Sequence, residues 1–193
     1  MPRPSLRAER TEEVLEACAR CVARDGLAGA TLEAIAREAG LARPLVRHHV
    51  GNRDDILGAF VERFFRDSDR SLDQLVASLP TRSAGRALVR DLFDPAHSDR
   101  QLVQVSMALV SGCASDPELA GRMGAWNRTF LERVAEVLAA EHPGADPDRL
   151  RSVAAGIVGI YFNVESLVSV DQDRRFREDS ARAALLLLDS LGT

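Results

Sequence analysis

Residues 31–53, TLEAIAREAGLARPLVRHHVGNR, constrain this chain most, because they predict two short helices joined by a tight glycine turn. Thr31 supplies a side-chain oxygen that can cap the first backbone N–H groups of the first helix. Gly40 follows the last periodic residue, at the position where a left-handed backbone closes a helix without a Cβ clash. The apolar residues that recur along one face of this helix are Leu32, Ile35, Ala36 and Ala39.

The second helix is predicted to begin near Arg43 and Pro44, because proline is tolerated in a first helical turn, where its missing N–H has no intrahelical partner. From residue 43 to residue 53 the chain carries three arginines, two histidines and no acid. Positive charge is therefore concentrated where a phosphate backbone would lie. The pair of helices has the outline of a DNA-reading helix-turn-helix.

Over this stretch the sequence resembles the tetracycline-repressor (TetR) family of bacterial transcription regulators. That family has a threonine before a helix carrying Ile-Ala, then Ala-Gly-hydrophobic. A short recognition helix follows, ending in an aromatic residue, His-hydrophobic, Gly or Asn, and a cation. In the same order and spacing, this chain has Thr31, Ile35-Ala36, Ala39-Gly40-Leu41, Pro44, His49-Val50, Gly51-Asn52 and Arg53.

The resemblance implies an all-α fold with two domains. Residues 1–51 would form an N-terminal three-helix helix-turn-helix DNA-binding domain. Residues 52–193 would form a long linker helix and a larger helical domain for effector binding and dimerisation. The motif itself covers about the first quarter of the chain, and the remainder has the length and helical character that the family requires.

Two positions depart from the family pattern. Ala42 stands where the family usually has Ser or Thr, so the recognition helix lacks a side-chain cap, a loss of about 1 kcal/mol. Arg47 stands where the family commonly has a tyrosine that bonds a phosphate. An arginine at this position can reach a phosphate through a charge-assisted bond or turn to a guanine edge, and the sequence leaves both roles open.

The motif also indicates which side chains meet DNA. Thr31 and Arg53 are expected to contact phosphates, Arg53 standing where the family places a lysine. His49 is either directed toward the DNA backbone or packed as a hydrogen-bonded core histidine. The adjacent histidines do not predict a metal pair, because neighbours one residue apart on a helix point in different directions. The residues expected at base edges are Arg43, Pro44, Leu45, Arg47 and His48, with the proline offering an apolar contact to a thymine methyl group.

The overall charge is compatible with DNA binding. The 193 residues carry a net charge of −4, yet residues 1–60 hold nine arginines and nine acids, so the acidic excess lies in the remainder. A DNA-binding footprint is local, so an acidic chain can still carry one. No apolar run approaches the roughly 20 residues of a membrane span, and the N-terminus lacks the apolar segment of a secretory signal. We therefore expect a cytoplasmic protein.

Three cysteines, Cys18, Cys21 and Cys113, form an odd and sparse set, which argues against a disulfide framework and fits a reducing compartment. Cys18 and Cys21 form a C-x-x-C pair, which invites a metal or redox interpretation. They lie within a helical pattern, however, and no second ligand pair follows at zinc spacing. We expect ordinary helix packing here, and we predict neither a metal nor a cofactor.

The rest of the chain is predicted to be helical, without strand alternation or internal repeats. Asn52, followed by Asp54 and Asp55, signals the start of a long helix that can extend to residue 79 and link two domains. Asp116 and Asp146, each followed by proline, are typical of an aspartate cap at a helix start. Helices are expected over residues 11–24, 83–93, 100–113, 117–141, 147–170 and 179–191, with a polar break over residues 171–178.

The predicted helix over residues 147–170 is apolar on two sides, so it needs two surfaces to bury them. The helix over residues 179–191 is similarly broad. Two such helices from each of two chains could form a four-helix bundle, and the resemblance implies this arrangement, because the family dimerises through its last helices. The alternative is a monomer in which both helices are central to the core. One face of the first helix holds Leu150, Val153, Ile157, Tyr161, Val164 and Val168, and the other holds Ala155, Gly156, Gly159, Ile160, Asn163 and Leu167.

The resemblance further implies that helices between residues 83 and 170 surround a small-molecule cavity, and that filling it moves the long fourth helix and spreads the reading heads. Aromatic residues and methionines at helical spacing are more often packing than ligand contacts, so both interpretations stay open. Asn127 and Asn163 are stronger candidates, because amides near apolar faces need partners. The candidate lining residues are Phe93, Met107, Cys113, Met123, Trp126, Asn127, Phe130, Phe162 and Asn163.

The sequence therefore predicts a ligand-responsive transcriptional regulator, most often a repressor in such families, that binds a palindromic operator as a homodimer and is released by a small-molecule effector. It is not expected to be an enzyme, since it shows no nucleophile-base pairing, phosphate-binding glycine loop or metal-ligand spacing. The alternatives are an all-helical enzyme or small-molecule carrier with a relic helix-turn-helix, and a helical protein-interaction module that dimerises and binds protein. The acid-free basic run favours the regulator, because neither alternative needs it.

Overall fold

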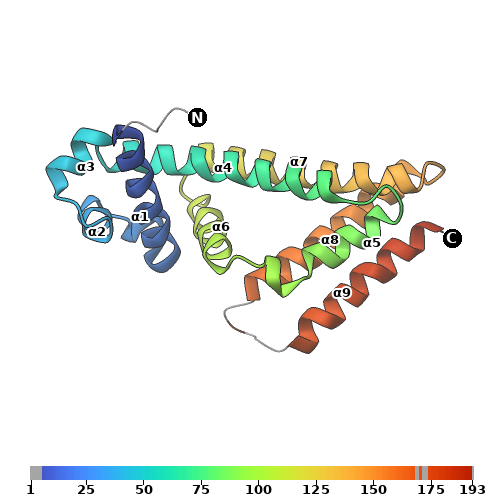
Figure 1. Cartoon of the computed structure of the whole chain (residues 1–193). Coiled ribbons are helices and arrows are strands. Elements are labelled where there is room, and N and C mark those ends of the chain that lie inside the picture. Colours follow the sequence, from blue (N-terminus) through green and yellow to red (C-terminus); the bar gives the residue numbers. More distant parts are fainter. Residues whose placement is uncertain (1–5, 168–169, 171–173, 193) are drawn as a thin grey trace. The chain divides into compact units, whose positions relative to one another are not determined.

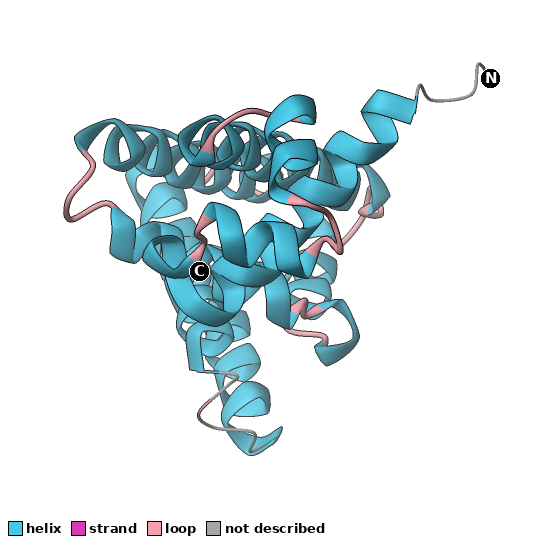
Figure 2. Ribbon diagram, turned by 90° about the vertical axis from the view of Figure 1, so that its left-hand side faces the viewer, coloured by secondary structure: helices cyan, strands magenta, loops and turns pink. Residues whose placement is uncertain are grey.

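The computed structural model describes residues 6–167, 170 and 174–192. Within these residues the chain folds into helices joined by loops and contains no strand (Figure 2), as the sequence predicts. Contacts group the chain into two compact units, residues 1–68 with 101–120 and residues 69–100 with 121–193. This grouping differs from a boundary at residue 51, because the long helix α4 (Arg53–Ser78) begins in the first unit and ends in the second.

In the first unit, α2 (Leu32–Glu38) and α3 (Arg43–His49) both contact α1 (Leu6–Gly29), as Figure 1 shows. Their core takes fully buried aliphatic side chains from all three helices and from the start of α4. Burying one such side chain is worth roughly 1.5–3 kcal/mol. These side chains are Val14, Val22, Ile35, Val46 and Ile56.

The helix α1 is longer at both ends than the predicted helix over residues 11–24. It starts at Leu6, and it continues past Gly26, where the sequence suggests a stop. Gly26 has φ 70° and ψ 178°, a non-helical conformation open to glycine, so the regular helix is interrupted by a kink at this residue. One further turn then reaches Gly29. The predicted break is therefore present at Gly26, and a short helical segment that was not predicted follows it.

The predicted start of α4 is confirmed in detail. The Asn52 side-chain oxygen accepts hydrogen bonds from the N–H groups of Asp54, at 2.8 Å, and Asp55, at 3.0 Å. In return, the Asp55 carboxylate accepts a hydrogen bond from the Asn52 N–H at 2.8 Å. Asp116 caps α7 (Pro117–Glu141) and Asp146 caps α8 (Pro147–Leu167) in the predicted way, because their side chains accept hydrogen bonds from N–H groups of the first helical turn. Each start therefore depends on a side chain that replaces a missing intrahelical partner.

The C-terminal half follows the predicted boundaries to within about three residues, apart from two larger differences. A short 3-10 helix, η1, follows residue 94, because the Asp94 side chain accepts a hydrogen bond from the Ala96 N–H at 2.8 Å. The last long helix starts at Arg174, inside the predicted polar break, since arginines are good helix formers whatever their polarity. The elements are α5 (Ala84–Leu92), η1 (Pro95–His97), α6 (Arg100–Gly112), α7 (Pro117–Glu141), α8 (Pro147–Leu167), α9 (Arg174–Asp189) and η2 (Ser190–Gly192).

In the second unit, α8 and α9 lie side by side (Figure 1). Gly156 permits this approach, because a Cβ atom there would lie 2.7 Å from Leu187 Cδ1. None of the helices in the described ranges combines the length and hydropathy needed to cross a membrane. The core of this unit draws on α4, α5, α7, α8 and α9, and its fully or almost fully buried aliphatic side chains include Leu88, Val89, Val134, Leu138, Ile157 and Val158.

The two faces predicted for α8 differ in burial. On the first face, the described residues are buried except for the half-buried Tyr161, and Val168 lies outside the described residues. On the second face, Gly156 and Ile160 are half-buried. The residues of that face left exposed are Ala155, Gly159 and Asn163. The second face is therefore only partly covered within one chain.

The second unit also buries an ion pair that the sequence analysis did not predict. Glu165 is 5% exposed, and Arg177 donates a hydrogen bond to its carboxylate at 2.8 Å. The Ser98 hydroxyl donates to the other carboxylate oxygen at 2.6 Å. Burial raises the pKa of the nearby Tyr161 to about 12, and the negative charge of Glu165 adds to the rise. This cluster ties α8 to α9 and to the segment between η1 and α6.

Candidate nucleic-acid interface

The helix α3 turns almost all of its side chains to solvent. Val46 is its one buried residue, and it holds the helix against the core of the first unit. The apolar Leu45 is 39% exposed. The five side chains predicted at base edges are all exposed, namely Arg43, Pro44, Leu45, Arg47 and His48. The structure therefore places them together on one short helix.

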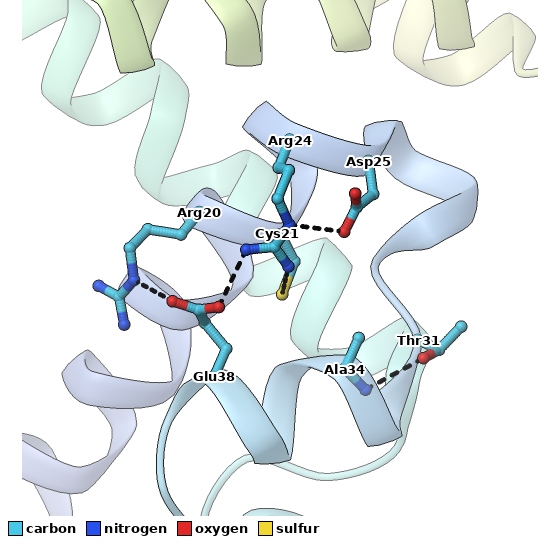
Figure 3. Close-up of polar contacts among 7 residues, drawn as sticks. All are labelled: Arg20, Cys21, Arg24, Asp25, Thr31, Ala34 and Glu38. Carbon is cyan, nitrogen blue, oxygen red and sulfur yellow. Dashed lines mark hydrogen bonds and ion pairs between the residues drawn. The ribbon is translucent and has the colours of Figure 1, made fainter.

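The start of α2 confirms the predicted cap. The Thr31 side-chain oxygen accepts a hydrogen bond from the Ala34 N–H at 3.1 Å (Figure 3). Thr31 is exposed, and its hydroxyl hydrogen can still be donated to an acceptor such as a phosphate oxygen. Gly40, in the turn that follows α2, has φ +65°, the left-handed conformation predicted for it. Both signals fix where α2 begins and ends, and thereby where α3 can start.

The helix α3 lacks a side-chain cap, as Ala42 predicts. Ala42 has an extended backbone and makes no capping hydrogen bond, and Pro44 lies in the first turn. Arg43 forms an ion pair with Glu33 of α2, and both side chains are more than half exposed. Exposed pairs of this kind contribute about 0–1 kcal/mol. Arg43 can therefore exchange this partner for a DNA acceptor at small cost.

His49 is half-buried behind the exposed end of α3. Its ring lies edge-on to that of His48, with centroids 5.3 Å apart and an interplanar angle of 70°. The His49 Nδ1 atom is enclosed and has no hydrogen-bond partner within the part of the chain that the structure describes. The ring is thus packed, but the hydrogen bond expected of a core histidine is missing at Nδ1.

Arg53 has partners that the sequence did not reveal. Its Nε–H donates to the Ala30 carbonyl at 3.0 Å, and its Nη2–H donates to the Leu27 carbonyl at 2.7 Å. The carboxylate of Asp54 lies 3.5 Å from Nη1. The guanidinium expected to face a phosphate is thus engaged with the end of α1 and the loop that follows it.

A polar network fastens the end of α2 to α1 (Figure 3). The Glu38 carboxylate accepts hydrogen bonds from Arg20 at 2.7 Å and from Arg24 at 3.1 Å, and Arg24 also donates to Asp25 at 3.0 Å. The hydrogen bonds from Arg20 and Arg24 hold the pKa of Glu38 below its ordinary value of 4.5. The charged form of Glu38 therefore stabilises the contact between the two helices.

We predict that Glu38→Gln lowers the melting temperature of the protein at pH 7. A carboxyl whose pKa is depressed on folding contributes stability above its unfolded pKa and loses it as the pH falls through the folded value. The difference between wild type and variant should therefore shrink below about pH 4.5 and vanish in stronger acid. Thermal unfolding of both proteins across this pH range measures the difference in melting temperature. A difference independent of pH would assign the effect to packing instead.

The two cysteines of the C-x-x-C pair are buried in α1, as the packing interpretation predicts. Burial raises the pKa of Cys18 to about 12, and the charge of Cys21 adds to the rise. Burial also raises the pKa of Cys21. Neither thiol is thus poised as a thiolate nucleophile or ligand at neutral pH. Among the described residues, no group of three or more histidines, cysteines or acids is placed to hold a metal ion.

The residues predicted to line an effector cavity do not form one group. The rings of Trp126, Phe130 and Phe162 lie 5.6 to 6.3 Å apart between centroids, and Tyr161, stacked on Phe130 at 9°, extends this aromatic cluster toward Phe93. Ring packing of this kind stabilises a core as readily as it contacts a ligand.

The other candidates lie apart from the rings or at the surface. Met123 is buried, and Met107, in the first unit, is 50% exposed. Cys113 is half-buried, and its thiol donates to the Leu109 carbonyl at 3.3 Å. The side chains of Asn127 and Asn163 are exposed to solvent in the single chain.

A cavity of about 440 Å³ lies elsewhere in the second unit and contains none of these candidates. Its walls come from the start of α5 and from the ends of α7 and α9. Most of the lining residues are polar or charged, although polar and apolar atoms share the wall about equally, whereas small-molecule sites are typically lined mainly by apolar side chains. The lining residues are Thr81, Arg82, Ser83, Arg86, Ala140, Glu141, His142, Leu188, Asp189 and Gly192.

Similar proteins share both the fold and the class of function. The HTH-type transcriptional regulator BetI of Burkholderia thailandensis is 25% identical over 162 residues, which cover 83% of this chain and 82% of that protein. A TetR transcription regulator from Haloarcula marismortui superposes with a TM-score of 0.73 at 19% identity, covering 94% of this chain and 97% of that chain. A TetR-family transcriptional regulator from Streptomyces coelicolor superposes with a TM-score of 0.77 at 17% identity, covering 96% of this chain and 91% of that chain. These proteins are transcription regulators and not enzymes, in agreement with the sequence prediction.

Two family descriptions match the sequence itself. Residues 14–60, which contain α2 and α3, match "Bacterial regulatory proteins, tetR family". Residues 80–189, more than half of the chain, match "Tetracyclin repressor-like, C-terminal domain". With an exposed basic helix in the first unit and a helical second unit, both matched by these descriptions, the chain belongs to the tetracycline repressor (TetR) family of ligand-responsive transcriptional regulators.

Proposed function

We propose that this protein is a cytoplasmic, homodimeric repressor that binds a near-palindromic DNA operator through α3 and releases it when a small-molecule effector binds. The observation that carries the proposal is the exposure of a short basic helix anchored by one buried residue, Val46. Arginine and histidine side chains can donate hydrogen bonds to base edges, and Leu45 and Pro44 can contact a thymine methyl group. Thr31 is proposed to donate its hydroxyl hydrogen to a phosphate.

The proposed dimer uses the part of α8 and α9 that one chain leaves uncovered. Ala155, Gly159 and Asn163 are four residues apart on the exposed side of α8. On α9, Leu186 is 69% exposed. Small residues allow helices to approach closely, and an exposed leucine gains by burial. A two-fold dimer presents its recognition helices to successive major grooves, roughly 34–36 Å apart.

The proposed effector site is the aromatic cluster of the second unit, defined by Phe93, Trp126, Phe130, Tyr161 and Phe162. The half-buried Trp126 reports on it, because it is the chain's single tryptophan and contacts two of the other rings. A ligand that enters the cluster should change tryptophan fluorescence and raise the melting temperature, since binding to the folded state stabilises it. Ligands bound in the polar cavity instead would leave the fluorescence unchanged.

The decisive experiment is the selection of bound duplexes from a random pool. The proposal expects an enriched, near-palindromic sequence whose half-sites lie about one helical turn, or a multiple of it, apart. Affinity should fall steeply with salt, because each neutralised phosphate contributes about 0.9 to the slope of log K against log salt. No enrichment, together with weak binding to every duplex, would favour an effector-binding or protein-interaction module without sequence-specific DNA binding.

We predict that Arg47→Ala weakens operator binding by about 1–3 kcal/mol and relaxes the sequence preference at one base pair. Arg47 is exposed on α3, where a guanidinium can make a bidentate contact with guanine. Competition binding with operators altered one base pair at a time measures both effects. Arg37→Ala, which removes an exposed arginine from α2, is the matched control. Equal weakening on every duplex would reassign Arg47 from a base to a phosphate.

A further inference from the structure

The guanidinium of Arg53 donates hydrogen bonds to two backbone carbonyls of the first unit. The Nε–H donates to the Ala30 carbonyl at 3.0 Å and the Nη2–H to the Leu27 carbonyl at 2.7 Å. Both acceptors are backbone atoms from the end of α1 and the loop that follows, where helix-terminal carbonyls lack intrahelical donors. Ala30 is fully buried, so its carbonyl needs a protein donor. Arg53 supplies it.

The two ends of this contact lie at special places in the chain. Ala30 immediately precedes Thr31, the residue that caps α2. Arg53 is the first residue of α4 and follows the end of α3 by four positions. The bond from Arg53 to Ala30 therefore joins the residue before the α2 cap to the first residue of α4. Ala30 and Arg53 are 23 positions apart along the chain, so this hydrogen bond closes a loop of 24 residues that contains both α2 and α3.

Few other contacts hold α3 in place, so the hydrogen bonds of Arg53 are important for its orientation. The helix buries one side chain, Val46, and has no side-chain cap at its start. Its far end connects to α4 through Gly51, which has φ +120°, and through the Asn52 cap. A left-handed glycine and an uncapped start leave the direction of α3 dependent on how its flanking residues are held.

We propose that Arg53 is a positioning residue for DNA recognition, which holds α3 in its reading orientation by joining the start of α2 to the start of α4. Resting on the proposed DNA-binding function, this role replaces the phosphate contact expected from the sequence. A planar guanidinium suits it, because its fixed fork serves two acceptors at once, whereas an ammonium is a single point donor.

The test compares Arg53→Met and Arg53→Lys with wild type on the selected operator and on a duplex of unrelated sequence. A positioning role predicts that Arg53→Met lowers operator affinity about tenfold or more, as loss of hydrogen bonds to a charged donor implies, with little change on the unrelated duplex. The salt slope should stay as in wild type. A phosphate contact predicts instead that Arg53→Met weakens both duplexes alike and reduces the slope by about 0.9, and that Arg53→Lys restores both.

Arg63→Met is the matched control for loss of stability alone. Arg63 also ties α4 to α1, with its guanidinium 2.8 Å from Glu12 and 3.7 Å from Glu16, but it lies ten residues farther from α3. Measured well below the melting temperature, this variant should keep the ratio of operator to unrelated-duplex affinity, whereas Arg53→Met should reduce it. An equal reduction in both variants would overturn the positioning role.

The positioning role and the DNA-binding function can fail separately. If the wild-type protein binds no duplex, the proposed function fails. Amide hydrogen exchange in α2 and α3 then still tests the closure, because Arg53→Met should accelerate exchange there more than Arg63→Met does. Unchanged protection of α2 and α3 in Arg53→Met would overturn the closure itself.

Discussion

Arg177→Met is expected to destabilise the second unit by about 3–5 kcal/mol, because it leaves a buried carboxylate without its counter-charge. Glu165 is 5% exposed, and Arg177 donates to it at 2.8 Å. Ser98 donates to the second oxygen, but a hydroxyl cannot neutralise the charge. Methionine retains much of the apolar stem of arginine, so the loss reports on the guanidinium and not on missing volume.

Urea unfolding followed by tryptophan fluorescence measures this change, since Trp126 lies in the same unit and packs on Phe130 and Phe162. Two further variants interpret the result. Glu165→Gln combined with Arg177→Met removes both charges and keeps an acceptor for Ser98, so it should recover most of the loss. Arg182→Met removes an exposed ion pair with Asp179 and should cost no more than about 1 kcal/mol. Equal stability of Arg177→Met and wild type would show that Glu165 is hydrated in solution.

Gly159→Glu is expected to weaken dimerisation about 100-fold or more, because two-fold symmetry brings two like charges into one interface, at a cost of several kcal/mol. A Cβ at Gly159 meets no atom within 4 Å in the single chain, so the substitution should leave the fold of each chain intact. Replacing a glycine within a helix should even favour the helix. Operator affinity should fall with dimerisation, since one half-site alone binds weakly. Sedimentation equilibrium and operator titration measure the two effects.

Gly121→Glu is the matched control for this substitution. Gly121 lies in α7, is exposed, and also offers open space to a Cβ. It should leave both dimerisation and operator binding as in wild type. By contrast, a Cβ at Gly156 would lie 2.7 Å from Leu187 Cδ1, so that position does not offer the open space found at Gly159 and Gly121. A Gly159→Glu protein that remains fully dimeric would place the interface on another surface.

Local signals in the sequence predicted most of the helices. Asp116 and Asp146, each followed by proline, mark the starts of α7 and α8, because the cap and the missing N–H act within one turn. The same holds for Thr31 and Asn52. Gly26 breaks the helical backbone where the sequence predicts a stop, but the short helical segment that continues to Gly29 was not predicted.

The solvent exposure of α3 was also predictable, because it follows from the polarity of the helix. The partners of Arg53 were not, since the carbonyls of Leu27 and Ala30 lie 26 and 23 positions away and carry no side-chain signal. Glu165 was visible as an acid within an apolar helix, but its partners become neighbours only in the folded chain. The aromatic residues of the expected effector site remain equally typical of core.

The single anchor of α3 has a consequence for how such regulators diversify. Because Val46 alone of its residues is buried, the rest of the helix can change identity with little penalty to folding. The same scaffold can thus be retargeted to new DNA sequences by exchanging a handful of surface side chains. Engineering of altered operator preference should begin with those positions and leave the valine untouched.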